Sequence, residues 1–231
     1  MDSQTIARNI ERVKATISDA CRRSGRRPED VRLIAVTKYV GIDTTRAVLD
    51  LGIEHIGENR VQEAVPKYDK LGSRGTWHFI GHLQSNKVKN VLGRFTYIHS
   101  LDRHSLAKEI QKRAAKRAMT VNCLLQVNVS GEKSKFGLAP SELVEFAKEV
   151  AEMSNIRIVG LMTMAPFVDN PEEVRPVFRE LRSLRDQLYR LELPQVGKLE
   201  LSMGMSNDYT VAIEEGATMV RLGSVLVGRE S

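Results

Sequence analysis

Reactive and phosphate-binding residue types stand at the ends of apolar segments that are typical of buried β-strands. They are Lys38 at the end of "VRLIAVTK" (31–38), Ser202 and Ser206 in "LSMGMSND" (201–208), and Arg221, Gly223 and Ser224 in "RLGSVLVG" (221–228). A lysine amine attacks aldehydes when burial or a nearby cation such as Arg221 keeps it unprotonated. Hydroxyls and backbone N–H groups at glycine-containing turns and helix starts bind phosphate. The pattern predicts a phosphorylated aldehyde held on Lys38 as a Schiff base.

The two-residue alternation of a β-strand sorts these groups onto one face. If Lys38 points inward, the apolar residues of the last two segments turn outward to helices, and Ser202, Arg221 and Gly223 turn inward. The outward residues are Leu199, Leu201, Met203, Val220 and Leu222. Polar groups from three strand ends therefore meet on one interior face, which indicates a site and not a core.

Eight strand-like segments alternate with helical patterns along the chain. They begin near residues 31, 53, 76, 96, 121, 156, 198 and 218, after an amphipathic helix at about 3–23. Such alternation implies parallel strands joined by helices. A doubly wound open sheet is the alternative, but the glycine-rich phosphate turns G-x-G-x-x-G and G-x-x-x-x-G-K-[ST] are absent. We expect a single (β/α)₈ TIM barrel over residues 1–231, with an extra N-terminal helix and lead-in at 1–28.

Two helix starts carry capping signals. Ser141 precedes an apolar-periodic segment with Glu142 in its first turn, which predicts an N-cap. Asn170 precedes Pro171 and a long amphipathic segment, which predicts a second cap with proline at the first helical position.

Composition excludes several classes of protein. Hydrophobic residues make up 42% and charged residues 28% of 231 residues, and the two cysteines, Cys21 and Cys123, form no metal-ligand pattern. Neither a secretion signal nor an apolar run long enough for a membrane span is present. The net charge of +6 comes largely from 21–27 and 108–119, without a nucleic-acid-binding signature. We expect a cytoplasmic protein that binds neither nucleic acid nor membranes.

The histidines do not predict a metal site. His78 and His82 are four residues apart on a strand and its exit, and not on one helix face. His55, His99 and His104 are scattered, and we interpret them as structural residues.

Several motifs follow one another in an order that resembles the pyridoxal-phosphate homeostasis proteins, which are single-domain relatives of the alanine racemase N-terminal barrel. The motifs are "AVTK" (35–38), "GENRVQE" (57–63), "WHFIGHLQSNK" (77–87), "IHSLDR" (98–103), "LLQVNVSGEKSKFG" (124–137), "GLMTM" (160–164), "LSMGMSND" (201–208) and "MVRLGS" (219–224). The resemblance covers nearly the whole chain.

The resemblance implies a cofactor and its site residues. Lys38 would carry pyridoxal 5′-phosphate (PLP) as an internal aldimine, with Arg221 near the pyridine nitrogen, where an arginine weakens the electron sink. The residues around the phosphate would be Ser202, Met203, Ser206, Gly223 and Ser224. Those near the ring would be Asn59, His78 and Met162, and Lys135 would lie near the site.

The resemblance also implies a role in vitamin B6 and amino-acid balance. The sequence ends soon after the eighth strand-like segment, so we expect neither the β-domain nor the second catalytic base of alanine racemase. Tyr39 follows Lys38 directly and points to the opposite strand face, so it is no substitute. The expected protein is a monomeric carrier and regulator of PLP, with PLP-dependent enzymes as possible recipients. The alternative is a weak PLP-dependent amino-acid racemase or related small enzyme.

Overall fold

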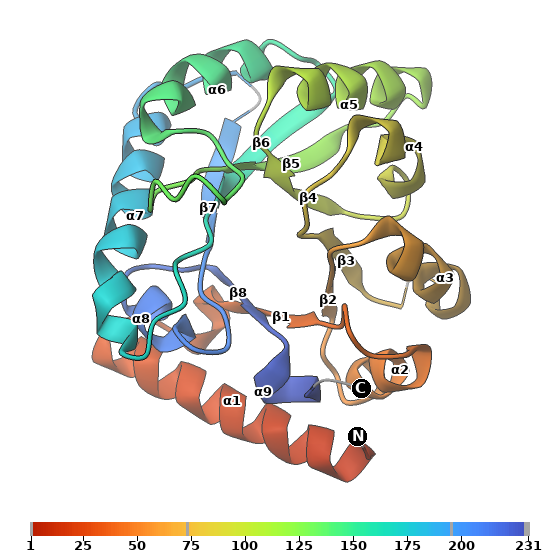
Figure 1. Cartoon of the computed structure of the whole chain (residues 1–231), viewed down its shortest axis with the longest axis vertical. Coiled ribbons are helices and arrows are strands. Elements are labelled where there is room, and N and C mark those ends of the chain that lie inside the picture. Colours follow the sequence, from red (N-terminus) through yellow and green to blue (C-terminus); the bar gives the residue numbers. More distant parts are fainter. Residues whose placement is uncertain (1, 73, 195, 229–231) are drawn as a thin grey trace.

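The eight strands form a closed parallel barrel in chain order, with helices around it (Figure 1). The computed structural model describes residues 2–72, 74–194 and 196–228. The strands are β1 (Arg32–Val36), β2 (His55–Glu58), β3 (Thr76–Phe79), β4 (Tyr97–Leu101), β5 (Val121–Gln126), β6 (Ile156–Met162), β7 (Val196–Ser202) and β8 (Met219–Leu222). The predicted TIM barrel is confirmed.

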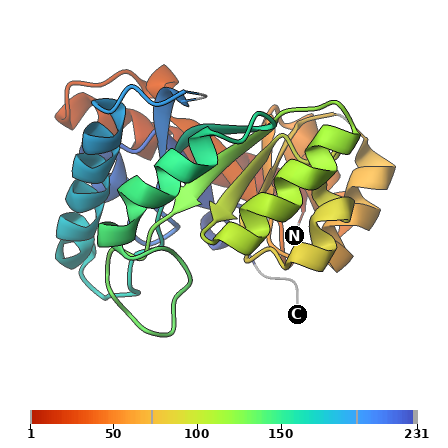
Figure 2. The same cartoon turned by 90° about the horizontal axis from the view of Figure 1, so that it is seen from above.

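The outer layer consists of α-helices, and short 3₁₀ turns precede some of them. The helices are α1 (Ser3–Arg23), α2 (Ile42–Asp50), α3 (Val61–Leu71), α4 (Val88–Val91), α5 (His104–Lys116), α6 (Leu143–Ala151), α7 (Arg175–Tyr189), α8 (Tyr209–Glu214) and α9 (Ser224–Val227). Helix α1 is the predicted extra helix, and it packs beside α8 and α9 (Figure 1). The loop after β5 projects at the end of the barrel toward which the strand arrows point (Figure 2).

Apolar residues pack on both sides of the strands. The larger core lies between strands and helices, and it includes Leu199, Leu201, Met203, Val220 and Leu222, as their outward placement predicts. A small second cluster of Ile34, Leu124, Met162 and Met219 fills part of the barrel interior. The alternation expected from the sequence is therefore confirmed for β7 and β8.

Two local predictions need correction. The strand at "VRLIAVTK" ends at Val36, and Lys38 lies two residues further on in a turn. Ser141 is not the N-cap of α6, because a 3₁₀ turn from Pro140 to Glu142 precedes the helix. The carboxylate of Glu142 instead accepts a hydrogen bond from the backbone N–H of Ala139, at 2.8 Å.

The second predicted cap is confirmed in part. The side chain of Asn170 accepts a hydrogen bond from the N–H of Glu172 at 3.2 Å. Pro171 follows it, but the first turn (Pro171–Val174) is a 3₁₀ helix that leads into α7.

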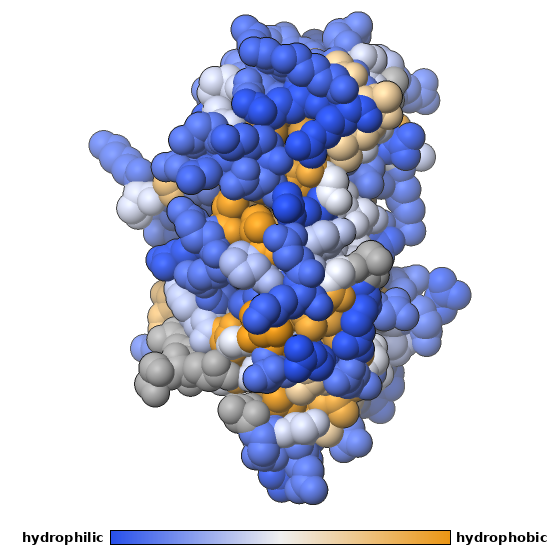
Figure 3. All heavy atoms as spheres, turned by 90° about the vertical axis from the view of Figure 1, so that its right-hand side faces the viewer, coloured by the Kyte–Doolittle hydropathy of each residue, from blue (hydrophilic) through white to orange (hydrophobic). Residues whose placement is uncertain are grey.

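Hydrophilic side chains cover most of the face shown in Figure 3, with apolar side chains in smaller areas between them. This distribution follows from amphipathic helices whose apolar sides face the strands. Among residues 2–72, 74–194 and 196–228, no helix has the length and apolar character that a membrane span requires.

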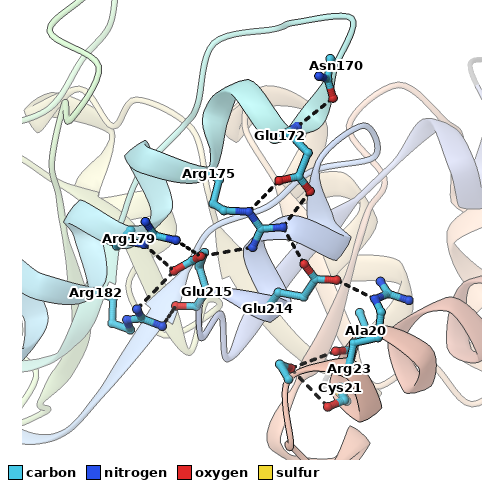
Figure 4. A network of polar contacts seen from close by, with 11 residues as sticks. Ala20, Cys21, Arg23, Asn170, Glu172, Arg175, Arg179, Arg182, Glu214 and Glu215 are labelled. Atoms are coloured by element: carbon cyan, nitrogen blue, oxygen red, sulfur yellow. Dashed lines mark hydrogen bonds and ion pairs between the residues drawn. The ribbon is translucent and has the colours of Figure 1, made fainter.

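A network of arginines and glutamates connects α7 and α8 to α1 (Figure 4). Arg175 binds Glu214 at 2.7 Å and Glu215 at 3.2 Å, and Glu214 also accepts from Arg23 at 2.8 Å. Glu215 accepts further contacts from Arg179 and, at 3.2 Å, from Arg182. Burial raises the pKa of Glu215, but the hydrogen bonds from Arg179 and Arg175 outweigh it and lower the pKa below its ordinary value. The ionised carboxylate therefore stabilises the fold.

Replacement of Glu215 by glutamine is expected to lower the free energy of unfolding by about 1–3 kcal/mol at neutral pH, because it removes charge-assisted hydrogen bonds. The folded-state pKa is lowered, so this contribution is present above the unfolded pKa of about 4.3 and is lost as the pH falls through the folded value. Urea denaturation of Glu215→Gln at neutral and acid pH measures both effects. The exposed Glu145→Gln variant is the control, and a difference for Glu215→Gln that is independent of pH would contradict the prediction.

Candidate functional site

The ends of β7, β8 and β1 lie side by side because β8 pairs with both of its neighbours as the barrel closes. Ala35 is in register with Leu222, so the next inward position on β1 lies against Gly223. A Cβ atom on Gly223 would lie only 3.3 Å from the carbonyl oxygen of Val36. The turn that carries Lys38 and the loop that follows β8 therefore start side by side at the same end of the barrel.

Lys38 is half-buried in the turn that follows β1. Its Nζ atom lies over the ring of the exposed Tyr39, 4.9 Å from the ring centroid. The backbone N–H of Thr37 donates to the carbonyl of Gly57 at 3.1 Å, so the residue before Lys38 still continues the sheet. The backbone that leads into Lys38 is therefore held by the sheet up to Thr37.

A buried ion pair on the outer side of the barrel holds this turn in place. Lys67 on α3 contacts the carboxylate of Glu58 on β2 at 2.8 Å and donates to the backbone carbonyl of Thr37 at 2.6 Å. The hydroxyl of Thr37 donates to the same carboxylate oxygen of Glu58 at 2.5 Å. Burial raises the pKa of Glu58, although Lys67 opposes this shift. The network fixes the peptide that leads into Lys38.

Arg221 is the buried cation of the barrel interior. Its guanidinium donates to the hydroxyl of Ser202 at 2.6 Å and to the carbonyl of Thr163 at 2.9 Å. Burial lowers the pKa of Arg221 to about 10, and the negative charge of Asp208 opposes this shift. Arg221 therefore stays cationic at neutral pH.

The β7–α8 and β8–α9 loops form a joined pair of turns. The N–H of Gly223 donates to the hydroxyl of Ser206 at 3.4 Å, and the N–H of Met205 donates to Asp208 at 2.6 Å. Gly204 has a φ of +96°, and a Cβ there would lie 2.7 Å from the Cβ of Ala212. Only glycine fits this tight turn, which brings the two loops together.

Ser202 is completely buried and makes contacts that are specific to the barrel interior. Its hydroxyl contacts the guanidinium of Arg221 and, at 2.8 Å, the Nδ1 atom of His99. Its β7 neighbour Met203 has its side chain in the outer core, so only the backbone of Met203 can reach the interior site.

The remaining residues implied by the resemblance lie at different depths. Met162 is in register with Ser202 and packs in the interior apolar cluster. His78 is fully buried, and its two ring nitrogens contact His55 and His99. Asn59 follows β2 and lines a cavity of about 520 Å³ that Arg60 and His82 also border, whereas Lys38 and Arg221 do not line it. The structure brings the residues of β1, β7 and β8 together, and Asn59 follows β2, which pairs with the other side of β1.

The loop after β5 reaches over the ends of neighbouring strands. Phe136 stacks on His82, which follows β3, with ring centroids 4.0 Å apart. Lys135 binds Glu132 at 3.1 Å and donates to the carbonyl of Met164 at 3.4 Å, beyond β6. This loop covers part of the C-terminal end of the barrel.

These features define a class of protein: a single parallel barrel with a lysine, a buried arginine and two glycine-containing turns at the joined ends of β1, β7 and β8. The family model described as alanine racemase, N-terminal domain, matches residues 1–231. The pyridoxal phosphate homeostasis protein of Aquifex aeolicus is 47% identical over 95% of this chain and 96% of its own length.

Solved structures agree with this result. PipY of Synechococcus elongatus PCC7942 with PLP bound has a TM-score of 0.84 and 32% identity over 96% of this chain and 100% of its own. A protein from Bifidobacterium adolescentis has a TM-score of 0.93 and 36% identity over 98% and 97% of the two chains. The chain belongs to the alanine racemase N-terminal domain family and, within it, to the pyridoxal phosphate homeostasis proteins.

The sequence interpretation did not identify the residues that support this site. Glu58 and Lys67 form the ion pair behind Lys38, and His99 contacts Ser202. A signal for His99 was present, because His55, His78 and His99 occupy strands that follow one another. The ion pair had no such signal, because it depends on how α3 packs on β2.

Replacement of Lys67 by methionine is expected to cost about 3–5 kcal/mol of unfolding free energy, because it leaves the Glu58 carboxylate buried without its cation. The double variant Glu58→Gln/Lys67→Met removes both charges and is expected to lose less. Urea denaturation measures each variant, and the exposed Lys70→Met on the same helix is the control. A double variant that loses as much as the sum of its single changes would contradict the coupling.

Proposed function

We propose that this protein holds PLP as a Schiff base on Lys38 and acts in intracellular vitamin B6 and PLP homeostasis, without substantial catalysis. Residues 1–231 act as one PLP-binding domain, in the cytoplasm and as a monomer, and PLP-dependent enzymes are the proposed recipients. One observation carries the proposal: the turn with Lys38 follows β1, which pairs with β8, the strand of the buried Arg221. The turns that follow β7 and β8 are hydrogen-bonded to each other at the same end of the barrel. The similarity to PipY, which was solved with PLP bound, supports the choice of ligand.

The residues present fit the two ends of PLP. Gly204 and Gly223 allow the backbone a close approach that a side chain would block. The hydroxyls of Ser206 and Ser224 stand at these turns, where backbone N–H groups of helix starts also lack helical partners. We assign the phosphate to this end and the ring nitrogen to Arg221. When bound, PLP supplies an aldehyde for the lysine and a ring that withdraws electrons.

Arg221 determines what the protein can offer the ring nitrogen of PLP. A guanidinium has no acceptor atom and stays protonated, so it can donate to the ring nitrogen but cannot share a proton placed there. Arg221 would therefore hold the ring nitrogen of PLP without protonating it, which would weaken the electron-withdrawing power of the ring. The buried contacts with Ser202 and Thr163 hold the guanidinium in place.

Attachment of PLP would need only the amine of Lys38. The unprotonated amine would supply the nucleophile for the aldehyde, and its two hydrogens would leave with the carbonyl oxygen as water, so no oxidant or reductant is required. The Thr37 peptide, held by Lys67, fixes the backbone from which the amine reaches the aldehyde.

The direct test is the absorbance spectrum of purified protein supplied with PLP, before and after borohydride. We expect a band at about 420 nm that disappears on reduction, with the cofactor mass fixed on the Lys38 peptide. Lys38→Ala is expected to lose the band. Lys148→Ala, which changes an exposed lysine on α6, is the matched control and is expected to keep it. An undiminished band in Lys38→Ala would place PLP on another lysine and overturn the proposal.

The second candidate is a weak PLP-dependent racemase. The half-buried position of Lys38 favours it, because an accessible Schiff base can exchange with amino acids. The test is α-proton exchange of amino acids in deuterated water, compared with free PLP at equal concentration. We expect no more than a few-fold increase over free PLP. Exchange that is at least about a hundredfold faster, and is lost in Lys38→Ala, is typical of general acid–base catalysis and would identify an enzyme.

A further inference from the structure

An unbroken chain of hydrogen-bond contacts crosses the barrel interior from Arg221 to His55. Arg221 contacts the hydroxyl of Ser202 at 2.6 Å, and this hydroxyl contacts Nδ1 of His99 at 2.8 Å. Nε2 of His99 lies 2.9 Å from Nδ1 of His78, and Nε2 of His78 lies 3.0 Å from Nδ1 of His55. The chain takes one residue from each of five strands, β8, β7, β4, β3 and β2, and ends at the half-buried His55.

Burial keeps these histidines neutral. It lowers the pKa of His78 and of His99 well below the ordinary histidine value, and the charge of Arg221 adds to the effect on His99. Burial also lowers the pKa of His55. A neutral imidazole has one N–H donor and one bare nitrogen acceptor. Each ring can therefore take part in two contacts only as a donor at one nitrogen and an acceptor at the other.

The cation at one end selects the direction of the whole chain. Arg221 can only donate, so Ser202 accepts from it and keeps its own hydroxyl hydrogen. Within the described part of the chain, His99 Nδ1 is the one acceptor in contact with that hydrogen. His99 then carries its proton on Nε2 and donates to His78, which donates from Nε2 to His55. The opposite direction would leave a buried hydroxyl hydrogen without an acceptor, which is costly.

Other charged groups and one aromatic ring lie near this chain of contacts. The positive charge of Arg32 on β1 lowers the pKa of His55 and of His78. Arg32 also forms an ion pair with Glu200 on β7 at 3.2 Å. The negative charge of Glu54 partly offsets the lowering of the His55 pKa, and that of Asp208 partly offsets the lowering of the Arg221 pKa. The ring of Tyr97 stacks on His78, with centroids 4.7 Å apart and an angle of 8° between the planes.

We propose that Ser202, His99, His78 and His55 form a one-directional hydrogen-bond relay in which each histidine is the neutral Nε2–H tautomer. The three histidines are positioning residues that hold Ser202 and, through it, the guanidinium of Arg221. The relay is a property of the protein in the absence of any ligand. Its effect on PLP binding rests on the proposed function.

The first test uses protein without PLP and reads the tautomers directly. Long-range ¹H–¹⁵N correlation spectra of ¹⁵N-labelled protein separate the Nε2–H form from the Nδ1–H form and from imidazolium. We expect the Nε2–H pattern for His78 and His99 from about pH 8 to about pH 5.5, on both sides of the ordinary histidine pKa of about 6.5. An Nδ1–H tautomer at either residue, or proton uptake within this range, would overturn the relay.

The second test compares two variants of the central residue. Glutamine at position 78 supplies one donor and one acceptor, whereas phenylalanine keeps the ring that stacks on Tyr97 but supplies neither. We expect His78→Phe to weaken PLP binding about five- to tenfold, as expected for the loss of one hydrogen bond, and His78→Gln to retain most of the affinity. His104→Gln, on the outer face of α5, is the control.

The two tests have separate outcomes. If His78→Phe binds PLP as well as the wild type, or better than His78→Gln, then packing and not the relay is what matters at this position. If the tautomers are as expected but no variant and no wild-type protein binds PLP, the proposed function fails and the relay stands. Urea denaturation of both variants shows whether a change in affinity comes from a change in folding.

Discussion

A buried guanidinium sets the conditions for the rest of this barrel. Arg221 is almost fully inaccessible to solvent, and a charge in such a place is unfavourable unless hydrogen bonds and nearby charge compensate it. Ser202 and the carbonyl of Thr163 each accept a hydrogen bond from it, and Asp208 supplies opposite charge nearby. The interior on this side of the barrel is therefore polar, and the apolar cluster of the interior has only four buried members.

Closure of the sheet determines which residues can meet. Because β8 pairs with β1, the ends of the first and the last strand are neighbours although nearly 200 residues separate them. The side chains of His78, His99 and Ser202 on the interior face are completely buried. Polar side chains on β2, β3, β4 and β7 then have to satisfy one another, as His55, His78, His99 and Ser202 do.

Much of the fold was predictable because strand and helix periods differ clearly. The eight strands, the first helix and the inward faces of β7 and β8 follow from apolar alternation, and the confirmed cap at Asn170 follows from local chemistry. The end of β1 was misjudged because Thr37, Tyr39 and Val40 are residue types that favour strands, and Thr37 still donates a hydrogen bond to Gly57 of β2. The Glu58–Lys67 pair was not predictable, because its two residues meet only through the packing of α3 on β2.

Lys38 and Arg221 are held by two networks on opposite sides of the barrel wall. The ion pair of Lys67 and Glu58 lies outside and fixes the backbone before Lys38, whereas the histidine chain lies inside and contacts Arg221 through Ser202. Side chains of successive strand residues point to opposite faces, so the two networks share no residue and their effects should be nearly additive. The backbone before Lys38 and the guanidinium of Arg221 are thus held by separate networks, and the pairing of β1 with β8 places the two strands that carry them side by side.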